Sequence, residues 1–376
     1  MPWPALCYIL LAQAQQDSWR AVRETEHYVV KTTGTAEQAE ALGKHMELVY
    51  RTYAALLNYQ KPATRKFTIR LYKDHDEYAK HGAGGTALAH YNPGTKELVG
   101  SADPDGMWAI FAHEGMHQFI DMVMPDFQKG VRSGQVPTWY SEGIADCIGN
   151  SEVRDGKMFM CTMSGYIAKM RIIVIQTAVR ENKVRPFREL LYLDQRRFYS
   201  ENGRLNYATG WALTHFLMVY PKTEDPAKQI PGGKYKSKLV QFHNLLASGK
   251  KRDEAYAIAF GIARPSDWDV IDKQWREYVL SFPDPLAGTP LAGLAADIGN
   301  LDKTDGVYVG AIAEDAACFK AGLRPGDVIL AVDGREVRHY GQLIPPLERK
   351  KAGETAAISV KRGGETVEIK VEWAGK

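Results

Sequence analysis

The chain has 376 residues, of which 45% are hydrophobic and 25% are charged, a composition typical of a globular protein. This length predicts more than one domain, since a domain usually takes about 150 residues. The 48 basic and 45 acidic residues almost cancel to a net charge of +3, which argues against a dedicated nucleic-acid-binding protein. No stretch reaches the roughly 18 apolar residues that a membrane-spanning helix needs, so we expect no transmembrane helix.

Residues 1–14 have two of the three features of a secretory signal peptide. Residues 5–12 form a short apolar run, and residues 12–14 have the small-x-small pattern that signal peptidase favours. The preceding residues 1–4 lack the usual Lys or Arg. We therefore expect an exported protein, located in the periplasm, the cell envelope or the extracellular space. The alternative is a cytoplasmic protein whose first residues are not a signal.

Residues 26–100 alternate between strand and helix patterns. The segment 27–31 predicts a strand, 36–57 an amphipathic helix, and 67–72 a half-buried strand with period-two alternation. The segment 86–99 has two short apolar runs around an Asn-Pro-Gly-Thr turn, which predicts a β-hairpin.

The pattern then becomes mostly helical as far as Phe282. Residues 283–290 are rich in proline, which disfavours a helix, and we interpret them as a linker. Strands return after it, so the sequence predicts an α+β protein with one domain at 26–282 and a second at 291–376. The predicted helices are 104–123, 138–149, 164–181, 206–220, 235–247, 251–260 and 266–280. The clearest strands of the second domain are 307–309, 328–332, 356–360 and 367–371.

The strongest chemical signal is a His-Glu-Gly-Met-His motif at 113–117, inside the predicted helix 104–123. Positions i and i+4 share one face of a helix, so His113 and His117 can hold one metal ion. Glu114 lies beside them, where it can hold and deprotonate a metal-bound water. The pattern is typical of a Zn2+ hydrolase.

A zinc hydrolase normally uses three protein ligands and leaves one position open, so a third ligand is needed. Glu142 follows His117 by 25 positions and lies on the predicted helix 138–149. Asp146 is one turn further along the same face, where it would accept the free ring N–H of a ligand histidine. The alternative is that both carboxylates belong to a solvated acidic helix face.

The motif at 113–117, followed by Glu142 and Asp146, resembles the gluzincin zinc peptidases, the thermolysin-type group. The segment 136–146 resembles the peptidase MA-like domains more closely still. The resemblance extends over roughly residues 26–280. It implies a zincin-like catalytic domain, built from a small mixed sheet and a helical subdomain, with Zn2+ as the cofactor.

The same resemblance implies roles for further residues. Glu142 would be the third zinc ligand, and the hairpin at 86–99 would be the edge of the active-site sheet, where a peptide binds by strand addition. Tyr207 would stabilise the oxyanion of the tetrahedral intermediate, with His215 as the second candidate. For both residues an ordinary buried position stays open as the alternative. Residues 81–87 contain no acidic side chain to grip a free amine, which disfavours an aminopeptidase.

The segment from Gly306 to Gly334 resembles a PDZ domain of the bacterial protease type, and the match extends over 291–373. Such a domain would bind the end of an extended chain beside a strand. By position, the loop that binds the chain's carboxylate would be Leu291, Ala292, Gly293 and Leu294. This loop departs from the usual aromatic- or glycine-rich pattern, and a PDZ-shaped spacer without a ligand is the alternative.

Two further features of the sequence suggest additional hypotheses. The segment 124–137, with Gly130 and Gly134, is a candidate mobile lid. Cys147 and Cys161 are close enough in sequence to form a disulfide in an oxidising compartment, or they are two small buried side chains.

The sequence thus predicts a zinc metallopeptidase that hydrolyses peptide bonds, with a PDZ domain that recruits substrate or partner chain ends. The expected partners are a peptide or protein substrate and a C-terminal peptide at the PDZ domain, with no nucleic acid. Two alternatives share the same site. One is a catalytically inactive, zinc-stabilised binding or scaffold protein, and the other is a zinc hydrolase of a non-peptide amide.

Overall fold

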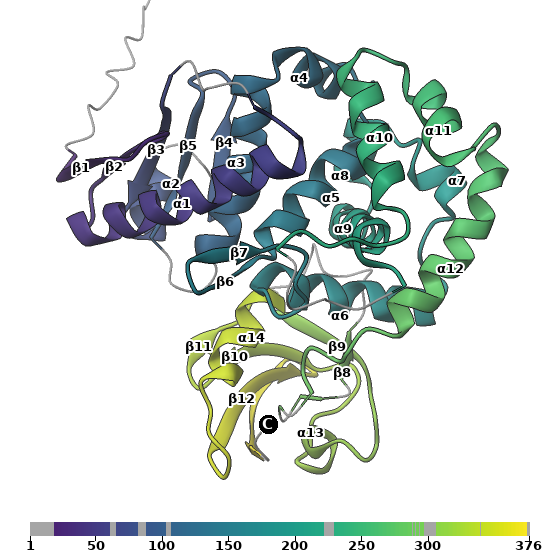
Figure 1. Cartoon of the computed structure of the whole chain (residues 1–376). Helices are drawn as coiled ribbons and strands as arrows, with labels where there is room; N and C mark the ends of the chain where they lie inside the picture. Colours follow the sequence, from purple (N-terminus) through teal and green to yellow (C-terminus); the bar gives the residue numbers. More distant parts are fainter. Residues whose placement is uncertain are drawn as a thin grey trace, which may run out of the picture.

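The computed structural model contains three parts, a small sheet with its helices, a helical subdomain and a C-terminal sheet domain (Figure 1). The structure describes residues 19–60, 65–81, 88–102, 107–221, 229–287, 289, 291–292, 294–296, 306–338 and 340–373. The mixture of helices and strands agrees with the predicted class. The candidate signal segment 1–14 lies outside the described residues.

The first sheet has five strands in the order β1-β2-β3-β5-β4. Its three central strands are parallel, whereas β1 and β4 pair antiparallel at the two edges. The predicted strands at 27–31 and 67–72 and the hairpin are present. The bounds are β1 Ala21–Glu24, β2 Tyr28–Thr32, β3 Phe67–Tyr72, β4 Ala89–Asn92 and β5 Glu97–Ser101.

Two long helices cover one face of this sheet. Helix α1 (Ala36–Leu56) contacts β2 and packs beside α3 (Met107–Val123), which contacts β4 and β5. Thr35 begins α1 with a capping box, because its hydroxyl accepts from the Gln38 N–H while the Gln38 side chain accepts from the Thr35 N–H. The short helix α2 (His75–Lys80) packs Tyr78 into a separate cluster with Tyr72, Val99 and Trp19.

The helical subdomain is built around α9, whose residues from Leu205 to Val219 are buried almost without interruption. Helices α5 and α6 both pack against α9. In Figure 1, α5 lies on the side of the first sheet and α6 on the side of the C-terminal domain. The long helices are α5 Thr138–Gly149, α6 Tyr166–Arg180, α9 Gly203–Val219, α10 Lys236–Ala247, α11 Arg252–Phe260 and α12 Asp269–Leu280. The short elements are α4 Pro125–Arg132, α7 Phe187–Leu190, α8 Gln195–Ser200, the 3-10 helix Pro265–Trp268 and the hairpin β6 Glu152–Arg154 and β7 Lys157–Phe159.

The segment 124–137, which the sequence suggested as a lid loop, instead holds helix α4. Pro125 occupies the start of the helix, and a Cβ added at Gly130 would lie 3.0 Å from the buried Val136. Helix α4 also contacts α3 and α10, so the segment packs on its neighbours as structured chain. The hairpin β6–β7 and helices α7 and α8 have no counterpart among the predicted elements.

The second domain forms a sheet in the order β13-β12-β10-β9-β8, with β11 paired to β10. The buried carboxylate of Asp327 ties its turns together, because it accepts the Arg324 N–H at 2.8 Å and two Arg362 N–H bonds at 2.7 Å. All four predicted strands are present. The bounds are β8 Leu294–Ala296, β9 Val307–Ile312, α13 Ala317–Lys320, β10 Val328–Val332, β11 Arg335–Glu336, α14 Tyr340–Glu348, β12 Thr355–Arg362 and β13 Glu365–Glu372.

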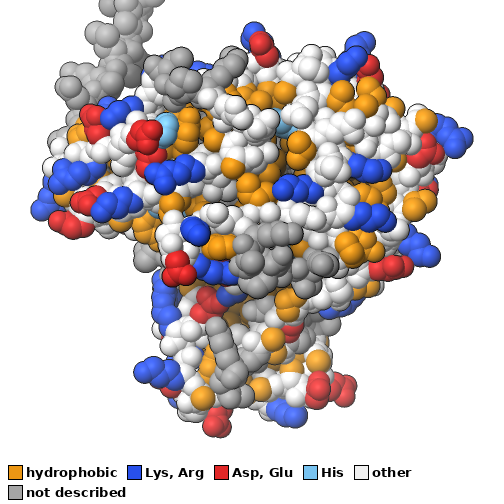
Figure 2. Space-filling view, viewed as in Figure 1, with side chains coloured by type: hydrophobic (Ala, Val, Ile, Leu, Met, Phe, Trp, Pro, Cys, Tyr) orange, Lys and Arg blue, Asp and Glu red, His pale blue; other side chains and the backbone are white. Residues whose placement is uncertain are grey.

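The surface, the helices and the cysteines add three observations. On the face seen in Figure 2, basic and acidic side chains alternate, in keeping with the small net charge. None of the helices that the structure describes combines the length and the apolar character needed to cross a bilayer. Cys147 and Cys161 are buried free thiols, which agrees with the second of the two interpretations given above.

Candidate metal centre and catalytic site

Helix α3 presents the motif histidines to a cleft and is held closely against α1. A Cβ added at Gly115 would lie 2.6 Å from Met46 Cε and 2.9 Å from the Tyr53 hydroxyl, so a larger residue would require these two side chains to shift. The Tyr53 hydroxyl also donates to the backbone oxygen of Ala112. The helix that carries His113 and His117 is therefore fixed in position by its neighbour.

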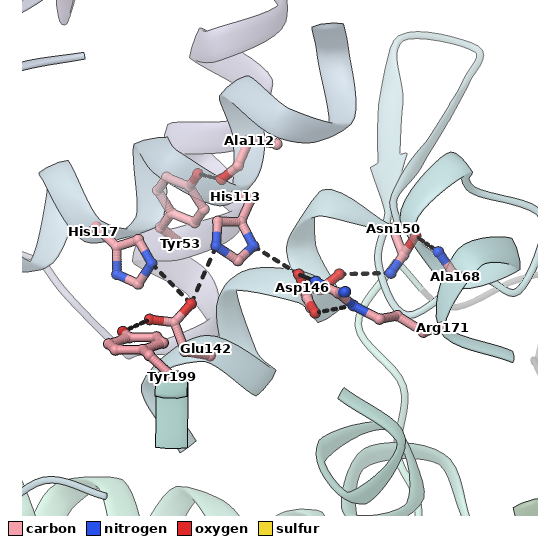
Figure 3. Close-up of polar contacts among 10 residues, drawn as sticks. All are labelled: Tyr53, Ala112, His113, His117, Glu142, Asp146, Asn150, Ala168, Arg171 and Tyr199. Atoms are coloured by element: carbon pink, nitrogen blue, oxygen red, sulfur yellow. Dashed lines mark hydrogen bonds and ion pairs between the residues drawn. The ribbon is translucent and has the colours of Figure 1, made fainter. Parts of the chain in front are cut away.

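Helix α5 places Glu142 opposite the two histidines, and all three side chains point at one another (Figure 3). The Glu142 Oε2 atom lies 3.3 Å from His113 Nε2 and 3.5 Å from His117 Nε2. This oxygen is buried and has no hydrogen-bond partner among the described residues. Helix α5 comes this close because Gly143 packs directly on α9, where an added Cβ would lie 2.4 Å from the Gly210 oxygen.

The two distances from Glu142 Oε2 to the histidine nitrogens have the spacing of a tetrahedral zinc site, and all three candidate ligand atoms lie within 4.8 Å of one another. Zinc bonds of about 2.0–2.1 Å to nitrogen and oxygen require ligand atoms roughly 3.3–3.4 Å apart. The observed values of 3.3 and 3.5 Å match that spacing. Two imidazoles and one carboxylate leave a fourth position open, and the site borders a cleft of about 250 Å³. The donor set and its buried, unpartnered oxygen are suited to Zn2+.

Asp146 lies against the ring of one of the histidines. Its Oδ1 lies 2.8 Å from His113 Nδ1, which places the ring proton on that side and leaves Nε2 facing Glu142. Arg171 on α6 donates its Nε–H to the Asp146 Oδ2 at 2.8 Å (Figure 3). Burial alone would raise the pKa of Asp146, but Arg171 and His113 outweigh it and lower that pKa.

The surroundings of Glu142 favour its ionised form. Burial opposes the charge on Glu142, but the nearby His117 and His113 outweigh it and hold the pKa of Glu142 well below its usual range. Burial likewise opposes protonation of the histidines, yet the carboxylates around them raise the pKa of both His113 and His117. The cluster is thus a set of mutually compensating charges.

Glu114 sits between the histidines and the sheet edge. Its Oε2 accepts the backbone N–H of Tyr91 at 2.9 Å, so one carboxylate oxygen is anchored to β4. The Tyr91 hydroxyl donates to Asp121 Oδ2 at 2.7 Å, and Lys96 pairs with the same oxygen at 2.6 Å. Strand β4 is therefore the edge strand beside the site, and the hairpin prediction holds there. Residues 82–87 of the expected substrate loop lie outside the described part.

The structure separates the two candidates for oxyanion stabilisation. Tyr207 lines the cleft, and its ring centroid is 6.5 Å from that of His113. His215 is fully buried, with Nε2 3.0 Å from the Cys161 oxygen and Nδ1 3.0 Å from the Tyr278 hydroxyl. His215 lies in the core and not in the cleft, so it is not placed to stabilise an oxyanion there, in contrast to the second candidate role given to it above. Its burial lowers the pKa of His215 to about 4.

Sequence reasoning missed two residues of the site. Tyr199 on α8 donates its hydroxyl to Glu142 Oε1 at 2.7 Å, so the carboxylate uses one oxygen for Tyr199 and turns the other to the histidines (Figure 3). No motif marks Tyr199. Arg171 is one of three cations in helix α6, beside Lys169 and Arg180, so the sequence did not single it out. Its guanidinium lies 4.9 Å from the centre of the Tyr207 ring.

The predicted PDZ loop lies at the start of the second domain. Leu291 and Leu294 are buried, and β8 begins at Leu294 on the open edge of the domain's sheet. Ala292 is half-buried, and Gly293 lies outside the described residues. The loop therefore leads into the edge strand, as a chain-end site requires.

Comparison with known families gives two matches. Residues 296–373 match the PDZ domain family, so the C-terminal part of the chain is a PDZ domain. Residues 107–229 match a family described as a protein of unknown function, DUF1570. That second range spans α3 to α9 and includes the three candidate ligand residues, with Glu114, Asp146, Arg171, Tyr199 and Tyr207.

Curated relatives are proteases that share a short stretch with this chain. The serine protease Do-like HtrA of Lactobacillus helveticus is 34% identical over 71 residues, 19% of this chain and 17% of that protein. The magnetosome formation protease MamE of Magnetospirillum gryphiswaldense is 36% identical over 83 residues, 21% and 11% of the two chains. The chain thus spans less than a fifth of the length of these relatives.

Two solved structures show weak similarity. A crystal structure of the HtrA3 PDZ domain with a phage-derived ligand has 22% identity and a TM-score of 0.17, covering 18% of this chain and 62% of that one. An aminopeptidase N family protein from Idiomarina loihiensis has 14% identity and a TM-score of 0.38, covering 94% of this chain and 67% of that one. These scores are too low to assign a fold or an activity.

Proposed function

We propose that this chain is a zinc-dependent peptidase that hydrolyses peptide bonds with a metal-activated water, and whose PDZ domain recruits chain ends. The observation that carries the proposal is the convergence of His113, His117 and the unpartnered Glu142 oxygen, at the spacing of a zinc site, beside Glu114. Bound Zn2+ would polarise the scissile carbonyl and make water nucleophilic near neutral pH.

Side chains of the protein would carry out the remaining steps, which are proton transfer, oxyanion stabilisation and orientation of His113. Glu114 has one oxygen tied to the Tyr91 N–H, so its other oxygen is left to take a proton from the attacking water and to pass it to the leaving amine. Tyr207 faces the cleft and would donate its hydroxyl hydrogen to the developing oxyanion. Asp146 and Arg171 hold His113 in the tautomer that presents Nε2.

We expect the edge strand β4 to set the orientation in which a peptide substrate binds. A peptide laid along the open side of β4 would pair with backbone groups other than the Tyr91 N–H, which Glu114 accepts, and bring a carbonyl over the candidate ligand cluster. Backbone pairing is independent of side-chain sequence, so we expect cleavage of unstructured chains of varied sequence.

The relatives support a proteolytic setting for the PDZ domain, since their names describe proteases, some of them periplasmic. We extend this to the chain as an exported peptidase. The inactive scaffold and the hydrolase of a non-peptide amide remain the competing functions for the same site. No separate observation favours either of these functions. The contact with the Tyr91 N–H, in contrast, supports a role for Glu114 as the general base.

Removal and return of metal test the proposal. Purified full-length protein would be stripped with a chelator and assayed on casein, before and after addition of one equivalent of Zn2+. We expect cleavage to disappear with the metal and to return with zinc. Cleavage that persists in metal-free protein would contradict zinc dependence, and no cleavage in either state would favour the scaffold.

A further inference from the structure

A group of polar side chains around Asp121 borders the cleft on the side of the β4–β5 turn. Asp121 Oδ2 accepts the Tyr91 hydroxyl at 2.7 Å, and it pairs with Lys96 Nζ at 2.6 Å and with an Arg132 nitrogen at 3.2 Å. Tyr91 also lines the cleft, so this group adjoins the space beside the candidate metal ligands. The proposed hydrolysis uses none of these side chains.

The cations of this group outnumber the acid that they surround. The Asp121 side chain is 6% exposed, whereas those of Lys96 and Arg132 are 30% and 54% exposed. Within the described residues, Asp121 is the ion-pair partner of both cations. Burial and the bond to Asp121 raise the pKa of Tyr91, while Arg132 and Arg65 oppose that rise, so a third cation lies near the same hydroxyl. Ammonium and guanidinium groups each carry several N–H donors, so donors remain for a second carboxylate.

The group has a defined place along the path of a substrate on β4. Near its start, β4 pairs with Gly100, where an added Cβ would lie 2.7 Å from Phe111 on α3. Beyond its end, the turn brings Lys96 to Asp121 on the same helix. Strand β4 therefore runs along α3 in the same direction, and the motif histidines lie between these two points. Asp121 is one helical turn, about 5.4 Å, beyond His117, and an extended peptide advances about 3.3 Å per residue, so the cations lie about two or three residues from the candidate ligands.

The direction of the substrate follows from strand pairing. A peptide added to β4 pairs best in the antiparallel direction, since the antiparallel ladder is the more stable of the two. The N-terminal part of the peptide then lies toward the β4–β5 turn, and therefore toward Lys96 and Arg132.

We propose that this end of the cleft is a subsite for an acidic side chain, located about two or three residues before the bond that is cleaved. The substrate carboxylate shares Lys96 and Arg132 with Asp121. The inference rests on the proposed peptidase function and deepens it, because it names acidic unstructured segments as the preferred substrates.

Mapping of cleavage sites tests the subsite. Casein digested by the zinc-loaded native protein would be sequenced by mass spectrometry, and peptides around one mapped site would carry Glu, Gln or Lys two or three residues before the cleaved bond. We expect kcat/KM to be about fivefold higher for the Glu peptide than for the Gln peptide, and lowest for the Lys peptide. The difference should shrink as salt is added, because the cations are partly exposed. No acidic preference, or one on the other side of the bond, would overturn the inference.

Substitutions at Arg132 show whether this group causes the preference. Arg132→Gln should reduce the Glu-to-Gln ratio of kcat/KM, and Arg132→Glu should make the Lys peptide the best of the three. The matched control is Lys129→Gln on the same helix, because Lys129 is 79% exposed and pairs with Asp126 instead. It should keep the ratio of the native protein, and the Tm of each variant checks its folding. A native ratio in both Arg132 variants would overturn the inference.

A binding measurement separates this inference from the peptidase proposal. The zinc-loaded Glu114→Gln protein would be titrated into fluorescein-labelled decapeptides of Gly, Ser and Val with one central Glu, Gln or Lys, followed by fluorescence anisotropy. The peptides are amidated, so that they offer no terminal carboxylate to the PDZ domain. Tighter binding of the Glu peptide supports the subsite even if the native protein cleaves nothing. Equal binding of the Glu and Gln peptides overturns the subsite even if casein is cleaved.

Discussion

The tight crossing of α5 and α9 at Gly143 holds Glu142 against the histidines, and one added methyl group tests this. In Gly143→Ala the new Cβ would lie 2.4 Å from the Gly210 oxygen and 2.4 Å from the Thr214 hydroxyl oxygen. The first contact is with helix backbone, which cannot turn aside as a side chain can. We therefore expect a destabilisation of about 3 kcal/mol, at the upper end for overpacked cores.

This loss corresponds to a fall in Tm of roughly 10 °C for a domain of this size, measured by calorimetry. Zinc affinity should fall as well, because Glu142 moves with α5. The matched control is Gly203→Ala at the start of α9, where an added Cβ meets only the Phe198 oxygen at 3.9 Å. That variant should keep or slightly raise the Tm, since alanine suits a helix better than glycine. Equal Tm values for both variants would refute the reasoning.

Three further predictions address the site and the PDZ domain. Asp146→Asn should weaken zinc binding about 10- to 100-fold in a competition titration with a chelating dye, because His113 loses the carboxylate that orients it; unchanged affinity would contradict that role. Tyr207→Phe should lower kcat about 100-fold with little change in KM, whereas His215→Gln should lower the Tm and leave kcat per folded molecule unchanged. The reverse pattern would return His215 to the mechanism. Burial raises the pKa of Asp327, but Arg362 and the Arg324 N–H outweigh it and lower that pKa, so this carboxylate stabilises the PDZ domain above about pH 4 and the stability is lost as the pH falls through the folded pKa. Urea midpoints between pH 7 and pH 3 should therefore fall for the native protein and change less for Asp327→Asn, and parallel curves would exclude the effect.

Much of the site was predictable because its spacing follows helix geometry. His113 and His117 are one turn apart, and Glu142 and Asp146 are one turn apart on the next long helix, so each pair had to share a face. The strands that the sequence predicted are present in both sheets, since period-two alternation and a Pro-Gly turn are local signals, whereas the short strands β1, β8 and β11 were not predicted. What the local signals do not contain is how two helices approach each other.

The residues that were missed or misplaced depend on that packing. Tyr199 lies on a helix of six residues, too short to show periodicity, and reaches Glu142 only through the tertiary fold. His215 is two turns from Tyr207 on α9, and that helix is buried on nearly all sides. Tyr207 therefore lines the cleft, whereas His215 packs in the core. Arg171 became part of the site because α6 crosses α5 at Asp146. Helix α4 was not predicted, because Gly130 and Gly134 indicated a loop in this segment.

The central claim is that one zinc ion and Glu114 together hydrolyse peptide bonds. The most direct test measures metal content and casein cleavage side by side for the native protein and Glu114→Gln. We predict one zinc per chain in both proteins, with cleavage by the native protein alone, since the proposed role of Glu114 is proton transfer and Glu114 is not one of the three candidate ligands. Cleavage by both would contradict the role of Glu114, and absence of zinc from both would contradict the site of His113, His117 and Glu142.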